Sequence, residues 1–339
     1  MKTLMNKKRR SILFILLTVV LIIITKVSWQ YLSNFVQKQK PVTPLLQQGK
    51  ARPPLQDLTI EAIRQRSFPG GNIKIEEDLS SQDGFRSYII SYPSERLKLY
   101  ALMNIPNTPK PKRGYPVIII NHGYIPPDKY STINSYKEFS DFYAKNGFLV
   151  FKPDYRGYGK SEGTTESGYF PVAYTYDVLN LISSIKNYKE ADANNIGLWG
   201  HSLGGNVTLR AAVSVSKDIK ASVIVAGGGA SANDILNYWK TKKYKSLSWI
   251  KDSGAYKLIE ELNNPSVTSE FLDKISPINY VSNITGRVSL HHGAKDESIP
   301  ISFSDTLYKA LKKVGNNVEY YVYEQGDHQF GGKEKEMLL

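Results

Sequence analysis

The sequence predicts an α/β protein built around a mostly parallel β-sheet. Short apolar segments typical of strands alternate with segments of helical spacing through most of the chain after Asp57. A single serine, Ser202, stands between one such strand and one such helix, with glycines on both sides. The 339 residues, 41% of them hydrophobic, suffice for a large core. Strands separated by helices need crossover connections, which make neighbouring strands parallel and place helices on both faces of the sheet.

Eight strands are predicted in chain order. The first two alternate apolar and polar residues across a short Pro-Ser turn, which indicates an antiparallel pair. The third, VIIIN, is a continuous apolar run typical of a strand buried on both faces. The predicted strands are 85–92, 96–106, 117–121, 148–154, 195–200, 221–229, 287–293 and 318–324, and the predicted helices are 134–146, 172–188, a helix after Ser202, and 302–315.

Residues 231–283 interrupt this alternation. The segment has no strand pattern, several lysines and tyrosines, and two tryptophans, Trp239 and Trp249. An insertion of this size between strands is often a cap over the carboxyl edge of a sheet, so we expect a small helical cap whose aromatic side chains line the substrate pocket. The alternative is a pair of ordinary surface helices. Its lysines keep the surface soluble, or attract an anionic substrate or a membrane.

The first 56 residues have a composition of their own. Five basic residues precede an uncharged apolar run from Ser11 to Thr25, and Trp29 and Tyr31 follow as interfacial residues. No A-x-A-like cleavage site follows, which favours an uncleaved membrane anchor over a removed signal peptide. We therefore expect a transmembrane signal anchor at 1–32, a proline-rich linker at 33–56 and a folded domain at 57–339. The basic flank places the N-terminus in the cytoplasm and the domain outside it; the alternative is secretion after cleavage.

Charge and cysteine content exclude several classes of function. The formal charge is +13, but all ten basic residues before Asp57 lack an acidic partner there, and 34 basic residues against 31 acidic ones remain. A domain this close to neutral does not indicate a nucleic-acid surface. The absence of cysteine excludes a disulfide scaffold and a thiolate metal site. We expect no metal or organic cofactor.

The motif Gly200-His201-Ser202-Leu203-Gly204 fits G-x-S-x-G, with a strand before it and a helix after it. A sharp strand-to-helix turn strains the backbone and crowds its neighbours, and flanking glycines relieve that crowding. The turn raises the serine hydroxyl above the sheet at the amino end of a helix, where the helix dipole favours developing negative charge. A helix-capping serine in a glycine-rich turn is the structural alternative.

A nucleophilic serine needs a base and an orienting acid. His328 follows the last strand, so its loop returns to the edge of the sheet that carries Ser202. Asp296, just after the strand 287–293, is the predicted acid. Competing carboxylates are Asp234, Glu297 and Asp327, and the other histidines, His122, His201, His291 and His292, are assigned to packing or to the surroundings of the site.

The oxyanion of an acyl-transfer reaction needs hydrogen-bond donors. The backbone N–H of Leu203, directly after the nucleophile, is the first predicted donor. The second should come from the turn after VIIIN, in NHGYIPP, and Tyr124 is the residue assigned to it.

The chain from Asp57 onward resembles an α/β-hydrolase, and its carboxyl half resembles the catalytic domain of the prolyl oligopeptidase family and related dienelactone-hydrolase-like esterases. The stretches that carry the resemblance are NHGY, FKPDYRGYGKSEG, IGLWGHSLGG, SPINYVSNITGRVSLHHGAKDESIP and LYKALKKVGNNVEYYVYEQGDHQF. The resemblance implies a mostly parallel eight-stranded sheet and assigns Ser202, Asp296 and His328 to nucleophile, acid and base. It gives Asp154, Arg156, Gly157 and Asp177 structural roles.

The sequence departs from the peptidase members of that family. Those members carry a large propeller domain, whereas only an anchor, a linker and a short extension are expected here, and Leu203 stands where they often have tyrosine. The leading hypothesis is therefore a membrane-tethered serine hydrolase of carboxylic esters or small amides. The alternatives are a serine peptidase acting on short peptides with the same triad and a non-catalytic scaffold of the same fold.

Overall fold

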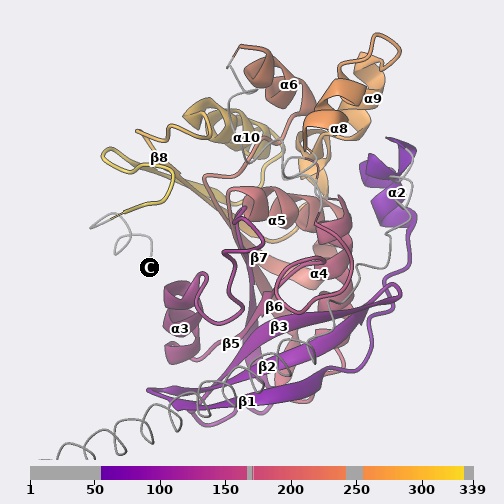
Figure 1. The fold of residues 1–339 in the computed structure, drawn as a ribbon. Coiled ribbons are helices and arrows are strands. Elements are labelled where there is room, and N and C mark those ends of the chain that lie inside the picture. The colour runs from indigo at the N-terminus through magenta and orange to yellow at the C-terminus, as the bar shows by residue number, and fades with distance from the viewer. Residues whose placement is uncertain (1–54, 166–169, 171, 242–254, 332–339) are drawn as a thin grey trace, which may run out of the picture. The chain divides into compact units, whose positions relative to one another are not determined.

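A computed structural model describes residues 55–165, 170, 172–241 and 255–331 (Figure 1). Pro53–Leu339 form one compact unit, and its described part begins with a short 3-10 helix, η1, at Leu55–Leu58. The anchor predicted at 1–32 and nearly all of the predicted linker lie outside the described residues. Within the described ranges, no helix is both long enough and apolar enough to cross a membrane.

The core of the fold is a nine-stranded sheet with strand order β1-β2-β3-β5-β4-β6-β7-β8-β9. The three strands at one edge pair antiparallel with their neighbours, and the remaining six are parallel to one another. The sheet is therefore mostly parallel, as predicted. The bounds are β1 Lys74–Gln82, β2 Phe85–Ser94, β3 Leu97–Pro106, β4 Tyr115–Asn121, β5 Leu149–Pro153, β6 Ala191–His201, β7 Ile219–Val225, β8 Arg287–Gly293 and β9 Val318–Tyr323.

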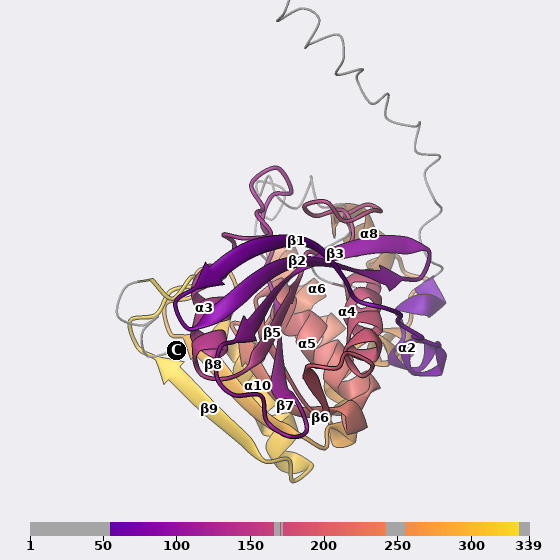
Figure 2. The same ribbon diagram turned by 90° about the horizontal axis from the view of Figure 1, so that it is seen from below.

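The predicted number of eight strands was wrong by one, because β1 was missed. Its sequence, KIEEDLSSQ, is exposed along almost its whole length and has no apolar alternation. It is held by its backbone hydrogen bonds to β2, with Lys74 opposite Ser91 and Gln82 opposite Phe85. Figure 2 shows β1 and β9 at opposite edges of the twisted sheet.

Helices cover both faces of the sheet, as predicted (Figure 1). On one face, α3 (Lys137–Lys145) packs over Ile118, Ile120 and Trp199 in a small apolar cluster. The opposite face carries the larger core, which includes buried residues of α2 (Ile60–Gln65), α4 (Val172–Ile185), α5 (Leu203–Ser214) and α10 (Ile301–Lys313). The short 3-10 helix η2, Ser216–Asp218, leads into β7.

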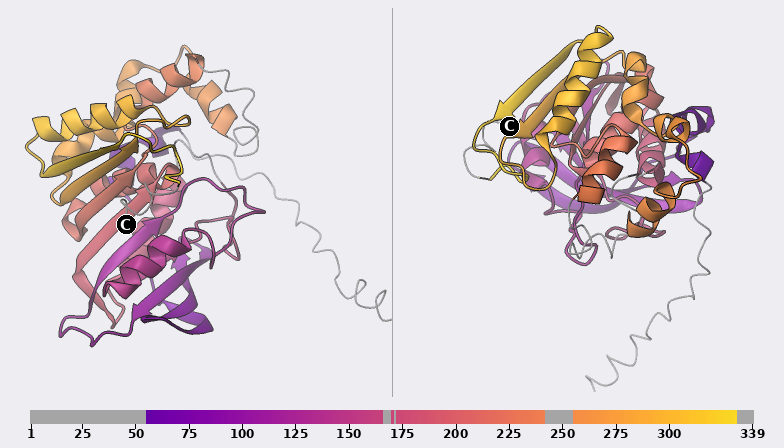
Figure 3. Two further views of the ribbon diagram at one scale, coloured as in Figure 1. Left: turned by 90° about the vertical axis from the view of Figure 1, so that its left-hand side faces the viewer. Right: turned by 90° about the horizontal axis from the view of Figure 1, so that it is seen from above.

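The insertion between β7 and β8 is helical, as predicted. Its described elements are α6 (Ala232–Thr241), α8 (Ala255–Leu262), α9 (Ser269–Lys274) and the 3-10 helix η4 (Pro277–Asn283). Figure 3 shows these orange segments grouped beside the yellow helix α10. The Tyr238 hydroxyl on α6 donates a hydrogen bond to the Ser298 carbonyl, at 3.1 Å. The insertion thus contacts the loop after β8, which carries the predicted acid.

Candidate active site

Ser202 occupies a strained turn between β6 and α5. Its φ of 55° and ψ of −119° lie in a region that residues other than glycine rarely adopt. The Ser202 N–H donates to the Val225 carbonyl at 2.9 Å, which ties the turn to the end of β7. The Ser202 carbonyl accepts from the N–H groups of Gly205 and Gly228, at 3.0 and 3.2 Å. Neighbouring backbone on both sides therefore stabilises the strained conformation.

The glycines beside Ser202 are required by close backbone packing. A Cβ atom at Gly204 would lie 1.9 Å from the carbonyl oxygen of Asn121, the last residue of β4. A Cβ atom at Gly200 would lie 2.2 Å from the Gly204 carbonyl oxygen and 2.4 Å from the Thr208 hydroxyl. Neither site has room for a side chain. The glycines allow the first turn of α5 to pack directly against the ends of β4 and β6.

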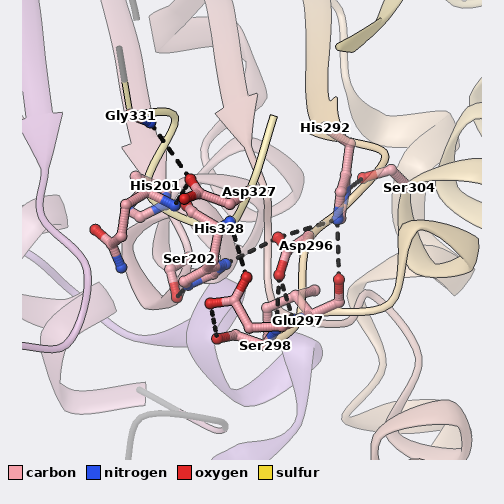
Figure 4. A network of polar contacts seen from close by, with 12 residues as sticks. His201, Ser202, His292, Asp296, Glu297, Ser298, Ser304, Asp327, His328 and Gly331 are labelled. Atoms are coloured by element: carbon pink, nitrogen blue, oxygen red, sulfur yellow. Dashed lines mark hydrogen bonds and ion pairs between the residues drawn. The ribbon is translucent and has the colours of Figure 1, made fainter. Parts of the chain in front are cut away.

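The structure brings the three predicted side chains together at the carboxyl ends of β6, β8 and β9 (Figure 4). The Ser202 hydroxyl lies 3.0 Å from His328 Nε2, and His328 Nδ1 lies 2.8 Å from Asp296 Oδ2. Both distances are within hydrogen-bond range, so Nδ1–H donates to the carboxylate and Nε2 accepts from the hydroxyl. This is the geometry in which a serine can pass its proton to an imidazole.

The Asp296 carboxylate is fixed by further contacts. Its Oδ1 accepts hydrogen bonds from the N–H groups of Ser298 and Ile299, at 2.8 and 2.7 Å, and its Oδ2 lies 3.3 Å from His292 Nε2. Burial opposes the charged form, but the hydrogen bonds from His292, His328 and the backbone of Ile299 outweigh it and hold the pKa of Asp296 well below its usual range. Asp296 is therefore ionised at neutral pH.

Among the residues that the structure describes, Asp296 is the carboxylate that hydrogen-bonds to the His328 imidazole, and the competing carboxylates contact other groups. Asp234 lies in the first turn of α6, where its N–H donates to the Ser231 hydroxyl. Asp327 accepts from the N–H groups of Gln329 and Gly331 within its own turn. Glu297 reaches the backbone N–H of His328 at 3.4 Å, so it lies beside the triad without replacing Asp296.

Three of the remaining histidines are held by hydrogen bonds to neighbouring residues. His122 is fully buried, donates from Nδ1 to the Gly123 carbonyl at 2.7 Å and packs on the ring of Tyr155; burial lowers its pKa to about 3. His291 bonds to Ser289 and Tyr323 within the sheet. His292 also contacts the candidate site directly. Its Nε2 lies beside the Asp296 carboxylate, and its Nδ1 lies 2.7 Å from the Ser304 hydroxyl.

His201, the residue before Ser202, contacts the backbone of the loop that carries His328. Its Nε2 lies 2.7 Å from the carbonyl oxygen of His328, and its Nδ1 lies 2.6 Å from the hydroxyl of Tyr136. Tyr136 could not be singled out from the sequence, because nothing in its local pattern marks a tyrosine 65 residues before His201 as a partner.

The two predicted oxyanion donors belong to adjacent turns. Leu203 is the first residue of α5, so its N–H has no partner within the helix. Tyr124 lies in the turn after β4. The backbone of that turn packs against Gly204, since a Cβ atom added at Gly204 would lie 2.7 Å from the His122 carbonyl oxygen. Both turns therefore meet beside Ser202, as the assignment requires.

The residues that the resemblance treated as structural pair away from the triad. The Arg156 guanidinium binds the buried Asp177 carboxylate, with Nη2 to Oδ1 at 2.7 Å. Asp154 accepts from Tyr130 and Thr132 at 2.7 and 2.6 Å. Across the residues that the structure describes, no three His, Asp or Glu side chains group as metal ligands would.

Comparison with known proteins identifies relatives of both esterase and peptidase type. Residues 134–338 match the prolyl oligopeptidase family, Peptidase_S9. The "uncharacterized peptidase YtmA" of Bacillus subtilis (strain 168) is 26% identical over 280 residues, which cover 82% of this chain and 95% of that protein.

Two solved structures share the fold at low sequence identity. The acetyl xylan esterase from Paenibacillus sp. R4 is 18% identical with a TM-score of 0.63, over 82% of this chain and 90% of that one. The Pyrococcus horikoshii acylaminoacyl peptidase is 23% identical with a TM-score of 0.58, over 74% of this chain and 38% of that one. The fold is that of the α/β-hydrolases, and the chain belongs to the prolyl oligopeptidase family of serine hydrolases.

Proposed function

We propose that this protein hydrolyses carboxylic esters of small acids through an acyl-enzyme on Ser202. The observation that carries the proposal is the continuous hydrogen-bonded line from the Ser202 hydroxyl through His328 to Asp296, with separations of 3.0 and 2.8 Å. A serine hydroxyl is a poor nucleophile without such a base, and an imidazole needs its orienting carboxylate.

The reaction follows from this geometry. His328 Nε2 takes the hydroxyl proton as Ser202 Oγ attacks the ester carbonyl, and the negative charge that develops on the carbonyl oxygen is stabilised by the N–H groups of Leu203 and Tyr124. Asp296 stabilises the imidazolium. The C–O bond to the alcohol then breaks, and the alcohol leaves with the proton from Nε2.

Deacylation repeats the sequence with water. His328 takes a proton from the water molecule, whose oxygen attacks the acyl carbonyl of Ser202. The bond to Oγ breaks, the carboxylic acid leaves, and the proton returns to Oγ. The ionised Asp296 favours the imidazolium in both halves of the cycle.

Two observations favour esters over peptides as the main substrates. The chain matches the Paenibacillus acetyl xylan esterase over 90% of that protein's length, but only 38% of the acylaminoacyl peptidase. Leu203 follows the nucleophile, where the peptidase members often have tyrosine. The second candidate is cleavage of short or N-acylated peptides, which the match to a peptidase family supports.

The test compares substrates and variants of the full chain. Wild-type protein should hydrolyse 4-nitrophenyl acetate and butyrate, and Ser202→Ala should reduce kcat/KM by at least about 10³-fold. Unchanged ester turnover in Ser202→Ala refutes the assignment. Parallel assays with alanine 4-nitroanilide and acetyl-alanine 4-nitroanilide decide between the candidates, because a peptidase cleaves one of these amides at a rate comparable with the esters.

We also propose, from the sequence of residues 1–32, that an uncleaved anchor holds the hydrolase domain on the outer side of a membrane. The support is the basic flank before the apolar run from Ser11 to Thr25. The alternative is secretion after signal cleavage. Fractionation of expressing cells with N-terminal sequencing tests this: the intact N-terminus should sediment with membranes, and a shortened chain in the medium would contradict it.

A further inference from the structure

A partly buried hydrogen-bonded chain connects the two loops of the proposed catalytic machinery. The Gly123 N–H lies 2.9 Å from the Tyr136 hydroxyl, that hydroxyl lies 2.6 Å from His201 Nδ1, and His201 Nε2 lies 2.7 Å from the His328 carbonyl oxygen. We call this chain the Tyr136–His201 relay. It joins the turn after β4, the start of α3, the residue before the nucleophile and the loop after β9.

The direction of each hydrogen bond in the relay follows from the two backbone groups at the ends of the relay. The Gly123 N–H can only donate, so the Tyr136 oxygen accepts from it and its own hydrogen points to His201 Nδ1. The His328 carbonyl can only accept, so His201 carries its hydrogen on Nε2. One arrangement of hydrogens therefore satisfies every member, and that arrangement needs a neutral His201.

The surroundings keep both side chains of the relay neutral. His201 has 6% of its surface exposed, and burial together with the charge of nearby His328 lowers its pKa to about 3. Burial raises the pKa of Tyr136 above its usual range. Neither group changes its charge near neutral pH, so the relay keeps its direction while His328 gains and loses a proton during catalysis.

Two local features show that the fold is shaped around this contact. Tyr136, directly before α3, has a φ of 56° and a ψ of 24°, a left-handed conformation that is unfavourable for a bulky residue. Gly123 leaves room for the Tyr136 hydroxyl, because a Cβ there would lie 2.6 Å from that oxygen and 3.2 Å from His201 Nδ1. A strained backbone that places one hydroxyl between a donor and an acceptor indicates a functional constraint.

The relay acts at both ends of the reaction centre. At one end it holds the backbone of His328, whose imidazole accepts from Ser202. At the other end it holds Gly123, the residue before Tyr124, whose N–H is the proposed second oxyanion donor. The separation between the base and the oxyanion donor is thus set through shared contacts with two side chains, whereas the Ser202 hydroxyl itself bonds to His328.

We propose that Tyr136 and His201 are positioning residues, which fix the His328 backbone and the Gly123–Tyr124 turn relative to Ser202. The proposal rests on the proposed function, since it assigns these residues to that reaction. A displacement of about 1 Å in a catalytic group can cost about 10²-fold in rate. Because the relay positions groups that act in the transition state, its loss should lower kcat and leave KM nearly unchanged.

The experiment compares Tyr136→Phe with Tyr143→Phe on full-length protein. Both variants remove one tyrosine hydroxyl from the α3 region, but Tyr143 lies outside the relay. With 4-nitrophenyl butyrate and burst titration of active sites, Tyr136→Phe should lower kcat per active site by about 10- to 100-fold with KM within about threefold. The control should stay within about twofold of wild type.

A double variant tests whether the relay acts as one unit. His201→Leu removes the contacts with the Tyr136 hydroxyl and the His328 carbonyl but leaves the hydrogen bond from the Gly123 N–H to Tyr136. Adding Tyr136→Phe should therefore lower kcat by less than the same change does in wild-type protein; independent roles would instead multiply the two effects. The inference is overturned if Tyr136→Phe keeps wild-type kcat per active site, even with a lowered unfolding temperature, or if the effects multiply. If wild-type protein itself hydrolyses no ester or amide, the proposed function fails, which is a separate outcome.

Discussion

Replacing Asp296 by asparagine should stop catalysis while keeping the fold, because of the hydrogen bonds that the carboxylate makes. The Oδ1 atom accepts two backbone hydrogen bonds, from Ser298 at 2.8 Å and Ile299 at 2.7 Å. An asparagine must place its oxygen there, because an NH₂ group would face two N–H donors. Its NH₂ group then points at His328 Nδ1, which normally donates to the carboxylate.

This arrangement reverses the tautomer of the catalytic imidazole. His328 must accept at Nδ1 and carry its hydrogen on Nε2, which then faces the Ser202 hydroxyl as a donor and cannot take its proton. The expected loss in kcat for such a reversal is about 10⁴-fold, which corresponds to about 5 kcal/mol of transition-state stabilisation. The side chains are isosteric, so the unfolding temperature should change little.

The assay is kcat for 4-nitrophenyl butyrate at neutral pH, with Asp327→Asn as the matched control. Asp327 undergoes the same chemical change one residue from His328, but its carboxylate accepts from the backbone of its own turn, at Gln329 and Gly331. The control should retain activity within a few-fold. An Asp296→Asn protein that keeps more than a tenth of wild-type kcat would refute the tautomer argument.

Two predictions concern stability. The pKa values of His122 and His201 are lowered from 6.5 to about 3 in the folded protein, chiefly by burial, so the unfolded chain binds up to two more protons between pH 6.5 and 3. The contribution of these groups to the free energy of unfolding is complete above pH 6.5 and falls below it by up to about 1.4 kcal/mol per pH unit for each histidine. Urea unfolding midpoints at pH 7.5 and 4.5 measure this loss, and equal midpoints would contradict it. Arg156→Ala leaves the Asp177 carboxylate buried without its cation and should lower the free energy of unfolding by about 3–5 kcal/mol. Arg113→Ala, at a side chain that is 67% exposed, should lower it by at most about 1 kcal/mol. Similar urea midpoints for the two variants would count against a stabilising role of the buried pair.

The strands that the sequence predicts best are those buried on both faces. The run VIIIN in β4 is apolar because α3 covers one face and the main core the other, so burial leaves a direct signal in composition. The exposed edge strand β1 gives no such signal, since backbone pairing with β2 holds it and its side chains face water. Its nine residues therefore read as a polar loop.

Some residues of the candidate site can likewise be predicted from the sequence, and others cannot. Ser202, Asp296 and His328 could be chosen from the sequence, because the motif and the strand order require a base and an acid in particular loops. The roles of Tyr136 and His201 could not, because they depend on one hydroxyl and one imidazole meeting across 65 residues of chain. A left-handed backbone at Tyr136 is likewise a product of tertiary packing, and no local sequence preference indicates it.

Ser202 is the proposed nucleophile, and His328 is proposed to activate it. A fluorophosphonate reacts with an activated serine and leaves a stable adduct, so peptide mass mapping of labelled full-length protein measures this directly. The adduct should be on Ser202 in wild-type protein and nearly absent in folded His328→Ala protein. A label on another residue, no label on folded wild-type protein, or equal labelling of His328→Ala would contradict the account.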